Sequence, residues 1–201
     1  MFPTTYNTET ELSAVNTILG TIGQSPVTEL DYNNPEIFYA YSLLQDTTID
    51  VQSEGWVFNT EKYYPLVPNS NEEIEIPANV IQMDFTGDPI YRDKDVVRRE
   101  GKLYDKLSHS YKFDRTVYAD ITWKFEYEDL PPCFRRYIAY RAARRAAANL
   151  IGNPDAYKMV TETEGMARAA CVEYECNQGD YSFFGFENGY RSYQPYNALA
   201  R

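Results

Sequence analysis

Five arginines share one alanine-rich stretch of this chain that contains no acid. The acid-free stretch runs from 130 to 154, and its arginines are Arg135, Arg136, Arg141, Arg144 and Arg145. An arginine guanidinium presents a planar fork of N–H donors that fits carboxylates and phosphates. The stretch therefore predicts ion pairs with acids of the fold or of a partner, or contacts with a nucleic-acid backbone.

The beginning of the chain has the opposite charge. Residues 1–61 contain nine acids and neither lysine nor arginine. The acids are Glu9, Glu11, Glu29, Asp31, Glu36, Asp46, Asp50, Glu54 and Glu61. Opposite-sign patches give orientation and register when subunits assemble, so we expect this segment to meet basic surface on a neighbour. The formal net charge of −11 argues against a general nucleic-acid binder, whose footprint would be basic.

Two groups of side chains could carry catalysis. His109, the single histidine, lies between Ser108 and Ser110, which is compatible with a Ser-His-acid arrangement. Glu126 and Glu128 could form the carboxylate pair of a glycosidase. A histidine in a loop beside serines is far more often a surface residue, and acid pairs arise by chance among 30 acids. We therefore predict a protein without catalytic residues.

Composition also bears on cofactors and on location. Cys133, Cys171 and Cys176 are odd in number and lack the paired short spacings of a zinc or redox site, so we expect buried free thiols and predict neither metal nor cofactor. No apolar run approaches the roughly 20 residues that span a bilayer. Residues 1–4 lack the basic and apolar regions of a secretion signal, so we expect the chain to stay in a cytosol, at least at first.

Periodicity predicts two helices in the first quarter of the chain. Thr8 and Glu11 have capping-box spacing ahead of an apolar stripe that stops at Gly23. Asn34 and Pro35 predict the N-cap and first residue of a second, antiparallel helix, which ends at Gly55.

Alternation with a period of two replaces the helical pattern after Trp56. It predicts strands at 81–85 and 117–125, with turns at 87–89 and 100–101, and therefore an antiparallel sheet made of hairpins. Pro131 and Pro132 open the arginine-rich third helix, which ends at Gly152, and Pro154 begins a fourth.

The predicted fold class is α+β, a bundle of about four helices with an antiparallel sheet inserted between the second and third. The bundle would comprise 1–55 and 131–178, the β domain 56–130, and an extended aromatic tail 179–201. The tail carries Tyr181, Phe183, Phe184, Phe186, Tyr190, Tyr193 and Tyr196. These residues are too apolar for a solvated linker, so we predict that they dock on another subunit, with folding back onto their own sheet as the alternative.

Each residue of an α-helix is rotated by about 100° from the one before it, and this rotation divides the side chains of the third helix between two sides. One side is predicted to hold Ala139, Ala142, Ala143, Ala146 and Leu150, and the other Phe134, Tyr137, Arg141, Arg144 and Arg145. Arginine beside aromatics is typical of interface cores, so we predict that Arg141, Arg144 and Arg145 form a subunit or portal interface. We expect them to pair with acids such as Glu36 or Glu54 of the same bundle or of the adjacent subunit, and Arg135 and Arg136 to be solvated. On the fourth helix the shared face is predicted to contain Ala156, Val160, Thr163, Ala167, Ala170 and Tyr174.

Several short motifs occur together in one order along the chain. They are Glu-Leu-Ser-Ala-Val-Asn at 11–16, Gly-Trp-Val-Phe-Asn at 55–59, Leu-Tyr-Asp at 103–105, the Leu-Pro start of the third helix at 130–134, and Cys-Val-Glu-Tyr-Glu at 171–175. This combination resembles the tail tubular protein A family, the adaptor of short-tailed, T7-like bacteriophages.

The resemblance implies a dodecameric ring that joins the portal to the tail nozzle, tubular protein B, with tail fibres held nearby and double-stranded DNA passing through the middle. It implies a helical part that faces the portal, a β part that faces the nozzle, and a location in the virion tail after assembly in the host cytoplasm. The sheet region and the longer aromatic tail depart from the family pattern. Two alternatives stay open from the residues alone: a nucleic-acid-binding module that uses the arginine helix, and a tail-associated hydrolase.

Overall fold

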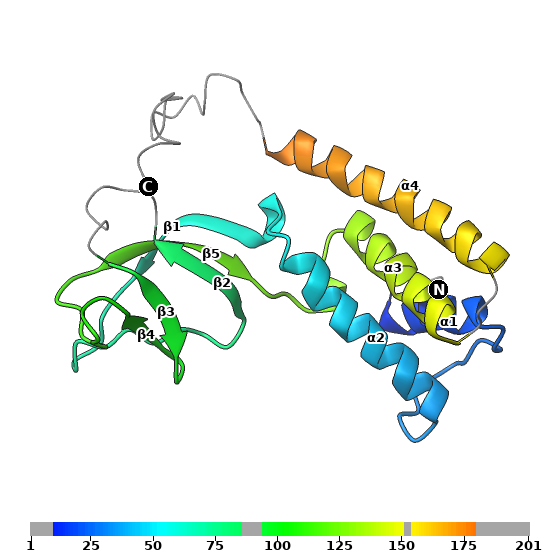
Figure 1. Cartoon of the computed structure of the whole chain (residues 1–201), viewed down its shortest axis with the longest axis horizontal. Coiled ribbons are helices and arrows are strands. Elements are labelled where there is room, and N and C mark those ends of the chain that lie inside the picture. The colour runs from blue at the N-terminus through cyan, green and yellow to red at the C-terminus, as the bar shows by residue number, and fades with distance from the viewer. Residues whose placement is uncertain (1–9, 86–93, 151–153, 180–201) are drawn as a thin grey trace, which may run out of the picture.

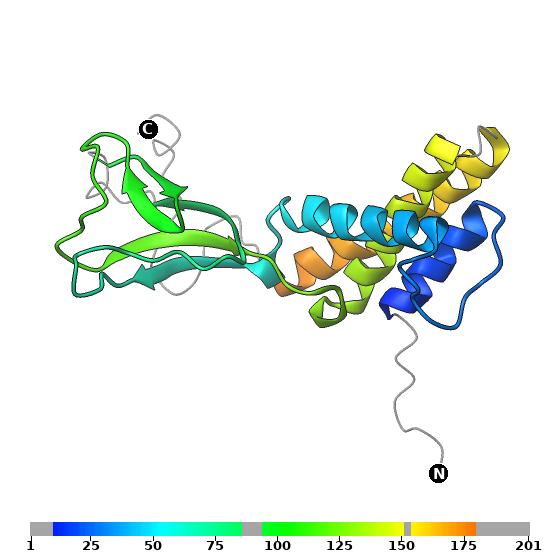
Figure 2. The ribbon, with the colours of Figure 1, turned by 90° about the horizontal axis from the view of Figure 1, so that it is seen from below.

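The computed structural model describes residues 10–85, 94–150 and 154–179. Four helices gather at one end of an elongated molecule and two small antiparallel sheets at the other (Figure 1). Seen from below, the strands extend away from the helices and one short connection region joins the two parts (Figure 2). Among the described residues, no helix is both long and apolar enough to cross a membrane.

Helix α1 (Glu11–Thr21) and helix α2 (Pro35–Gln52) form where their caps predict. The Asn34 side chain accepts a hydrogen bond from the Glu36 backbone N–H, and proline at the first position needs no donor of its own. The α1 cap is Thr10, whose hydroxyl accepts from the Ser13 N–H, so the predicted cap two residues earlier was wrong. Thr10 has the same spacing to Ser13 that Thr8 has to Glu11.

Helix α3 (Pro132–Leu150) is the centre of the bundle, because α1, α2 and α4 (Pro154–Gln178) all pack against it. Its alanines Ala142, Ala143 and Ala146 are fully buried and let the neighbouring helices approach closely. Phe134 and Tyr137, predicted on the opposite side, are buried as well. The helix is therefore enclosed on more sides than its two-sided pattern indicated, although Arg136 and the last residues up to Leu150 are exposed.

Five strands make two antiparallel sheets. β1 (Thr60–Leu66), β5 (Val117–Trp123) and β2 (Val80–Phe85) form the first sheet in the order β1-β5-β2. β3 (Val96–Arg99) and β4 (Lys102–Asp105) form a separate hairpin, which turns at 100–101 as predicted. Glu100 and Gly101 both have positive φ in this turn. Glycine adopts that left-handed conformation without steric strain, so only Glu100 is strained. The predicted turn at 87–89 lies outside the described residues.

The α+β fold with its sheet between α2 and α3 is thus confirmed. Alternate residues of β5 are buried, and they join Leu66, Leu103 and Phe113 in a core that is separate from that of the helices. Phe125 packs against both cores. It therefore marks the connection region between the helical part and the β part.

Two expectations about α4 and the cysteines were wrong. Ala167 of the predicted face is buried, but Ala170 is exposed, and Glu164 and Cys171 are buried in addition. Glu164 and Cys171 are each one position beyond a residue of the predicted stripe, Thr163 and Ala170, and they are three and four residues from Ala167. Of the three thiols only Cys171 is buried; Cys133 is half-buried and Cys176 is exposed.

Candidate functional site: the joint and the arginine network

A buried amide network joins the helical part to the β part. The Gln52 side chain, at the end of α2, donates to the Phe125 carbonyl at 3.0 Å and accepts from the Phe125 N–H at 2.7 Å. Gln52 is completely buried, so both hydrogen bonds are shielded from water. The pairing fixes the end of α2 against the chain that leaves β5. We call this connection region, centred on Gln52, Trp56, Asn59 and Phe125, the joint.

Asn59 completes the joint through three hydrogen bonds. Its amide N–H groups donate to the carbonyls of Gln52 and Trp123 at 2.9 and 3.0 Å, and its amide oxygen accepts from the Trp56 N–H at 2.8 Å. The Trp56 indole donates to the Val51 carbonyl, and its ring meets the Phe134 ring edge to face at 4.9 Å. The Gly-Trp-Val-Phe-Asn motif therefore builds the joint. Gly55 has a φ of +74°, a conformation that few other residues adopt.

The end of α4 also holds the joint. The Glu175 carboxylate accepts from the Val57 N–H, with its closer oxygen at 2.9 Å. Val57 begins the short 3-10 helix η1 (Val57–Asn59), whose first N–H has no partner within the helix. Tyr174 packs edge to face on Phe134, 5.7 Å between ring centroids. The Cys-Val-Glu-Tyr-Glu motif thus fastens α4 to the region between α2 and β1.

Next to the joint, two arginines converge on one acid and one tyrosine. Arg141 on α3 and Arg168 on α4 lie 2.7 and 3.1 Å from the Glu54 carboxylate. Both also donate to the Tyr137 hydroxyl oxygen, at 2.9 and 2.7 Å. The Arg168 guanidinium lies over the Trp56 ring at 5.9 Å, within the range of a cation–π contact. The cluster ties three helical elements and the joint together.

The cluster keeps its charges. Burial disfavours the Arg141 cation, but the hydrogen bonds with Glu54 and Tyr137 outweigh it, and the pKa of Arg141 is raised. The hydrogen bond with Tyr137 is the largest contribution for Arg168, whose pKa is also raised despite desolvation. Both guanidiniums are therefore positively charged at neutral pH. Their role here is to pair and position, and neither is poised to transfer a proton.

The remaining arginines of α3 are engaged within the same chain. Arg145 lies 2.9 Å from Asp50 and donates to the Thr47 hydroxyl, and Arg144 lies 2.5 Å from the mostly buried Glu164 of α4. The predicted pairing with Glu54 is confirmed, whereas Glu36 instead accepts a hydrogen bond from Gln24. Glu36 is in the first turn of α2, far along the helix from Glu54. The acids that Arg141 and Arg145 contact, Glu54 and Asp50, are instead near the end of α2.

Arg135 and Arg136 differ from each other. Arg136 is exposed, as predicted, but Arg135 is only 9% exposed, so the prediction that it is solvated was wrong. Its backbone carbonyl accepts from the Tyr127 hydroxyl at 2.9 Å, in the turn that precedes α3. A charged residue in the first turn of a helix can be covered by the preceding loop, which the helical period does not reveal.

The candidate catalytic groups do not assemble. The Ser108 hydroxyl donates to Asp105 and does not face the His109 ring. His109 is exposed at a φ of +52°, and its ring nitrogen lies 3.5 Å from the Tyr104 hydroxyl. Asp105 is buried, and although burial alone would raise its pKa, hydrogen bonds from Ser108 and two backbone N–H groups lower it. Asp105 therefore organises the 105–110 turn. Glu126 and Glu128 are both exposed beside the short helix η3 (Tyr127–Asp129).

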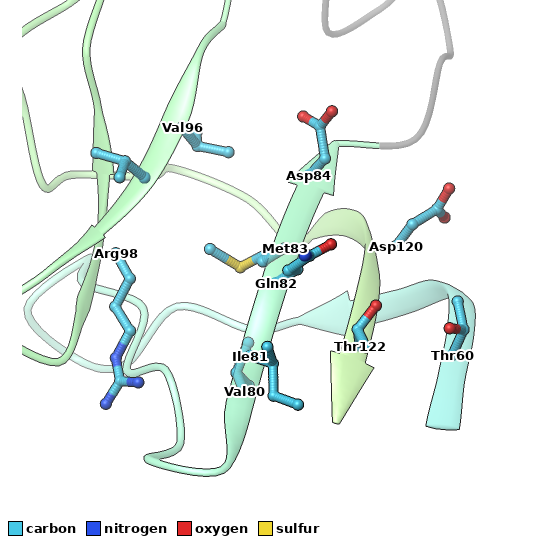
Figure 3. A pocket seen from close by; sticks show the side chains of 11 residues that line it. Thr60, Val80, Ile81, Gln82, Met83, Asp84, Val96, Arg98, Asp120 and Thr122 are labelled. Atoms are coloured by element: carbon cyan, nitrogen blue, oxygen red, sulfur yellow. The ribbon is translucent and has the colours of Figure 1, made fainter. Parts of the chain in front are cut away.

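A groove of about 630 Å³ lies along β2, between the sheet and β3. Figure 3 shows Arg98 on one side of β2, with Asp120 and Thr122 on the other. Asp120 accepts from the Tyr63 N–H and Arg98 donates to the Ala78 carbonyl, so both charges also serve the fold. Within the described residues no group of three histidines, cysteines or acids is placed to hold a metal ion.

Several residues of the joint were not singled out from the sequence. Gln52, Glu175 and Arg168 are ordinary polar residues of helices, and their contacts with Phe125, Val57 and Glu54 join segments far apart in the chain. The sequence pointed to the joint only through the two motifs at 55–59 and 171–175. The predicted tail residues Tyr181, Phe183, Phe184, Phe186, Tyr190, Tyr193 and Tyr196 lie outside the described residues.

Together these features define a protein of the α+β class, in which arginines and buried amides hold two cores in a fixed relation. The chain belongs to the tail tubular protein family, whose model matches residues 12–181. It is similar to Tail tubular protein A of Klebsiella phage KP34, with 27% identity over 147 residues that cover 73% of this chain and 76% of that protein. Family membership supports a structural role in a bacteriophage tail, assembled with other tail components.

Proposed function

We propose that this protein is the adaptor of a short-tailed phage, a dodecameric ring that joins the portal to the tail nozzle and lets the genome pass during ejection. The observation that carries the proposal is the joint. It holds a helical part and a β part rigidly at opposite ends of an elongated subunit (Figure 2). A protein that bridges two different partners needs two surfaces in a fixed relation, and buried hydrogen bonds provide that rigidity.

In this proposal the helical part, 1–55 and 131–178, faces the portal, and the β part, 56–130, faces the nozzle, with tail fibres nearby. The tail at 179–201 docks on a neighbouring subunit or the portal through its aromatic residues. Arg141, Arg144 and Arg145 border a subunit contact, since each guanidinium side chain is a quarter or more exposed while it pairs internally. The protein assembles in the host cytoplasm and ends in the virion tail.

The ion pairs of α3 do not favour the alternative of a DNA-binding module. Arg141, Arg144 and Arg145 each contact a carboxylate of the same chain, so a phosphate would have to displace that acid. The protein lets DNA pass without gripping it, because tight phosphate contacts would slow ejection.

Electron microscopy of the full-length protein mixed with its portal tests the proposal. We expect rings seated on the portal, and we expect their attachment to weaken as salt rises, because acids of residues 11–61 other than Asp50 and Glu54 form no ion pair in the described part of this subunit. Attachment that does not change between low and high salt would contradict the electrostatic part alone. A protein that neither forms rings nor binds the portal would contradict the adaptor function.

A further inference from the structure

Two of the motifs in this chain each contain a cysteine. Cys133 belongs to the Leu-Pro start of α3 at 130–134, and Cys171 begins the Cys-Val-Glu-Tyr-Glu motif at 171–175, near the end of α4. Two thiols that meet in a folded protein can be joined by oxidation, whereas thiols that are far apart cannot. The packing of α3 against α4 therefore decides what chemistry these cysteines can do.

Helices α3 and α4 pack side by side and run in opposite directions (Figure 1). The Tyr137 hydroxyl oxygen accepts a hydrogen bond from Arg168 at 2.7 Å. Nearer the start of α3, the Phe134 ring contacts the Tyr174 ring, which is nearer the end of α4. A step toward the start of α3 is thus matched by a step toward the end of α4.

This register brings the two cysteines together. Cys133 is four residues before Tyr137, and Cys171 is three residues after Arg168. Each cysteine is therefore about one helical turn from the contact between Tyr137 and Arg168, on the face that makes this contact. Cys171 is completely buried in the core of the helices, and Cys133 is half-buried and packs against the same core.

The titration of Cys171 agrees with this placement. Burial raises the pKa of the Cys171 thiol to about 12, and the charge of Cys133 and a hydrogen bond with it add to the rise. Cys171 therefore keeps its proton at neutral pH and has no exposed surface. Cys133, which is half-buried, is the thiol of the pair that a small solute can reach.

We propose that Cys133 and Cys171 are a modification site for peroxide, which joins them in a disulfide that fastens the end of α4 to the start of α3. The bond holds the part of α4 whose Glu175 contacts the joint. Disulfides persist outside cells and are reduced in a cytosol, so the site responds to the surroundings of the chain. It depends on the packing of α3 against α4 alone and can be tested apart from the adaptor function.

The reaction balances with peroxide as the oxidant. The Cys133 thiolate attacks one peroxide oxygen, so that an S–O bond forms, the O–O bond breaks and the hydroxide that leaves takes up a proton. The Cys171 sulfur then attacks the sulfur of this sulfenic acid. The S–S bond forms, the S–O bond breaks, and the second hydroxide leaves as water with the proton of Cys171. The two sulfurs together lose two electrons, and peroxide is reduced to water.

Peroxide treatment of the full-length chain tests the site. The protein carries Cys176→Ser, so Cys133 and Cys171 are its remaining cysteines. It is reduced, freed of reductant, treated with hydrogen peroxide and then alkylated in denaturant. We expect alkylation of both cysteines before treatment and of neither after it, an intact mass lower by two hydrogen atoms, and linked tryptic peptides 125–135 and 169–191. The Tm should rise by roughly 5 to 15 °C and return to its first value on reduction.

Matched variants show whether packing selects this pair. Cys171→Ala with Cys176 retained offers Cys133 an exposed partner five residues further along the same helix. Cys176 is about 140° around α4 from Cys171, so we expect no disulfide within the chain and no rise in Tm. Cys133→Ala with Cys176→Ser should give the same result. Circular dichroism equal to that of the parent verifies that both variants are folded.

The other outcomes each overturn the inference. Oxidation of Cys133 to sulfinic acid without a link would show that the two sulfurs cannot meet. Dimers on a non-reducing gel would show that Cys133 reacts with a second copy in place of Cys171. A link that leaves the Tm unchanged would show that the disulfide does not fasten α4. A disulfide between Cys133 and Cys176 that forms as readily would show that packing does not select Cys171.

Discussion

Replacing Asn59 by alanine tests whether the joint holds the two cores together. The substitution removes three buried hydrogen bonds, with lengths of 2.8, 2.9 and 3.0 Å, and leaves the Gln52 and Trp123 carbonyls and the Trp56 N–H without their partner. At about 1 kcal/mol net for each bond, the free energy of unfolding should fall by about 3 kcal/mol, and more where the orphaned groups stay dry. For a chain of this size that corresponds to roughly 6 to 12 °C in Tm.

The assay is urea denaturation followed by two signals. Trp56 lies in the helical core and Trp123 in the β core, so tryptophan fluorescence reports both sides of the joint, while circular dichroism reports the helices. In Asn59→Ala the unfolding transition seen by fluorescence should separate from the one seen by circular dichroism, because the two cores lose the hydrogen bonds that couple them.

Asn149→Ala is the control for this prediction. Asn149 is exposed and donates a single hydrogen bond, to the Tyr39 hydroxyl at 3.0 Å, so its loss should change stability by less than about 0.5 kcal/mol. If Asn59→Ala lowered the free energy of unfolding by less than about 1 kcal/mol with coincident transitions, the joint would not be the coupling element.

Four further predictions follow from the cysteines, from a buried ion pair and from the tail. Burial, reinforced by Cys133, raises the pKa of Cys171 to about 12, so the folded state keeps the proton and the free energy of unfolding should fall from about pH 9 toward pH 12. Cys171→Ala should flatten that fall in pH-dependent denaturation, and an equally steep fall in the variant would contradict the prediction. Iodoacetamide at pH 8 should label Cys176 and leave Cys171 unmodified in the folded protein, as peptide mass spectrometry would show. Arg144→Glu puts a second carboxylate beside Glu164, whose side chain is 11% exposed, and should destabilise the bundle by at least about 2 kcal/mol, which a thermal melt equal to that of the parent would refute. Deleting 181–201 should keep the helix content and weaken portal attachment in a pull-down, whereas an unfolded truncated protein would show that the tail belongs to its own core.

Local sequence determined where most elements begin and end. Asn34 with Pro35 starts α2, Pro132 opens α3, and the alternation around Ile121 makes a strand, because caps, proline and side-chain period act within a few residues of one another. The charge segregation also indicated the pairing of Glu54 with an arginine of α3. Even here the α1 cap moved to Thr10, since two candidate hydroxyls stand two residues apart.

Only the tertiary structure decided which polar groups meet. Glu54 and Glu36 are alike in sequence, yet only Glu54 reaches Arg141 and Arg168, because helix crossing brings the end of α2 to α3 and α4. The same long-range packing buries the face of α4 that includes Cys171. The joint has the same origin: Gln52 and Phe125 are 73 residues apart, and only the folded chain makes them hydrogen-bond partners. The periodicity of a sequence shows which face of a single helix or strand is buried. Contacts such as these depend on how two elements are placed relative to each other, which periodicity does not show.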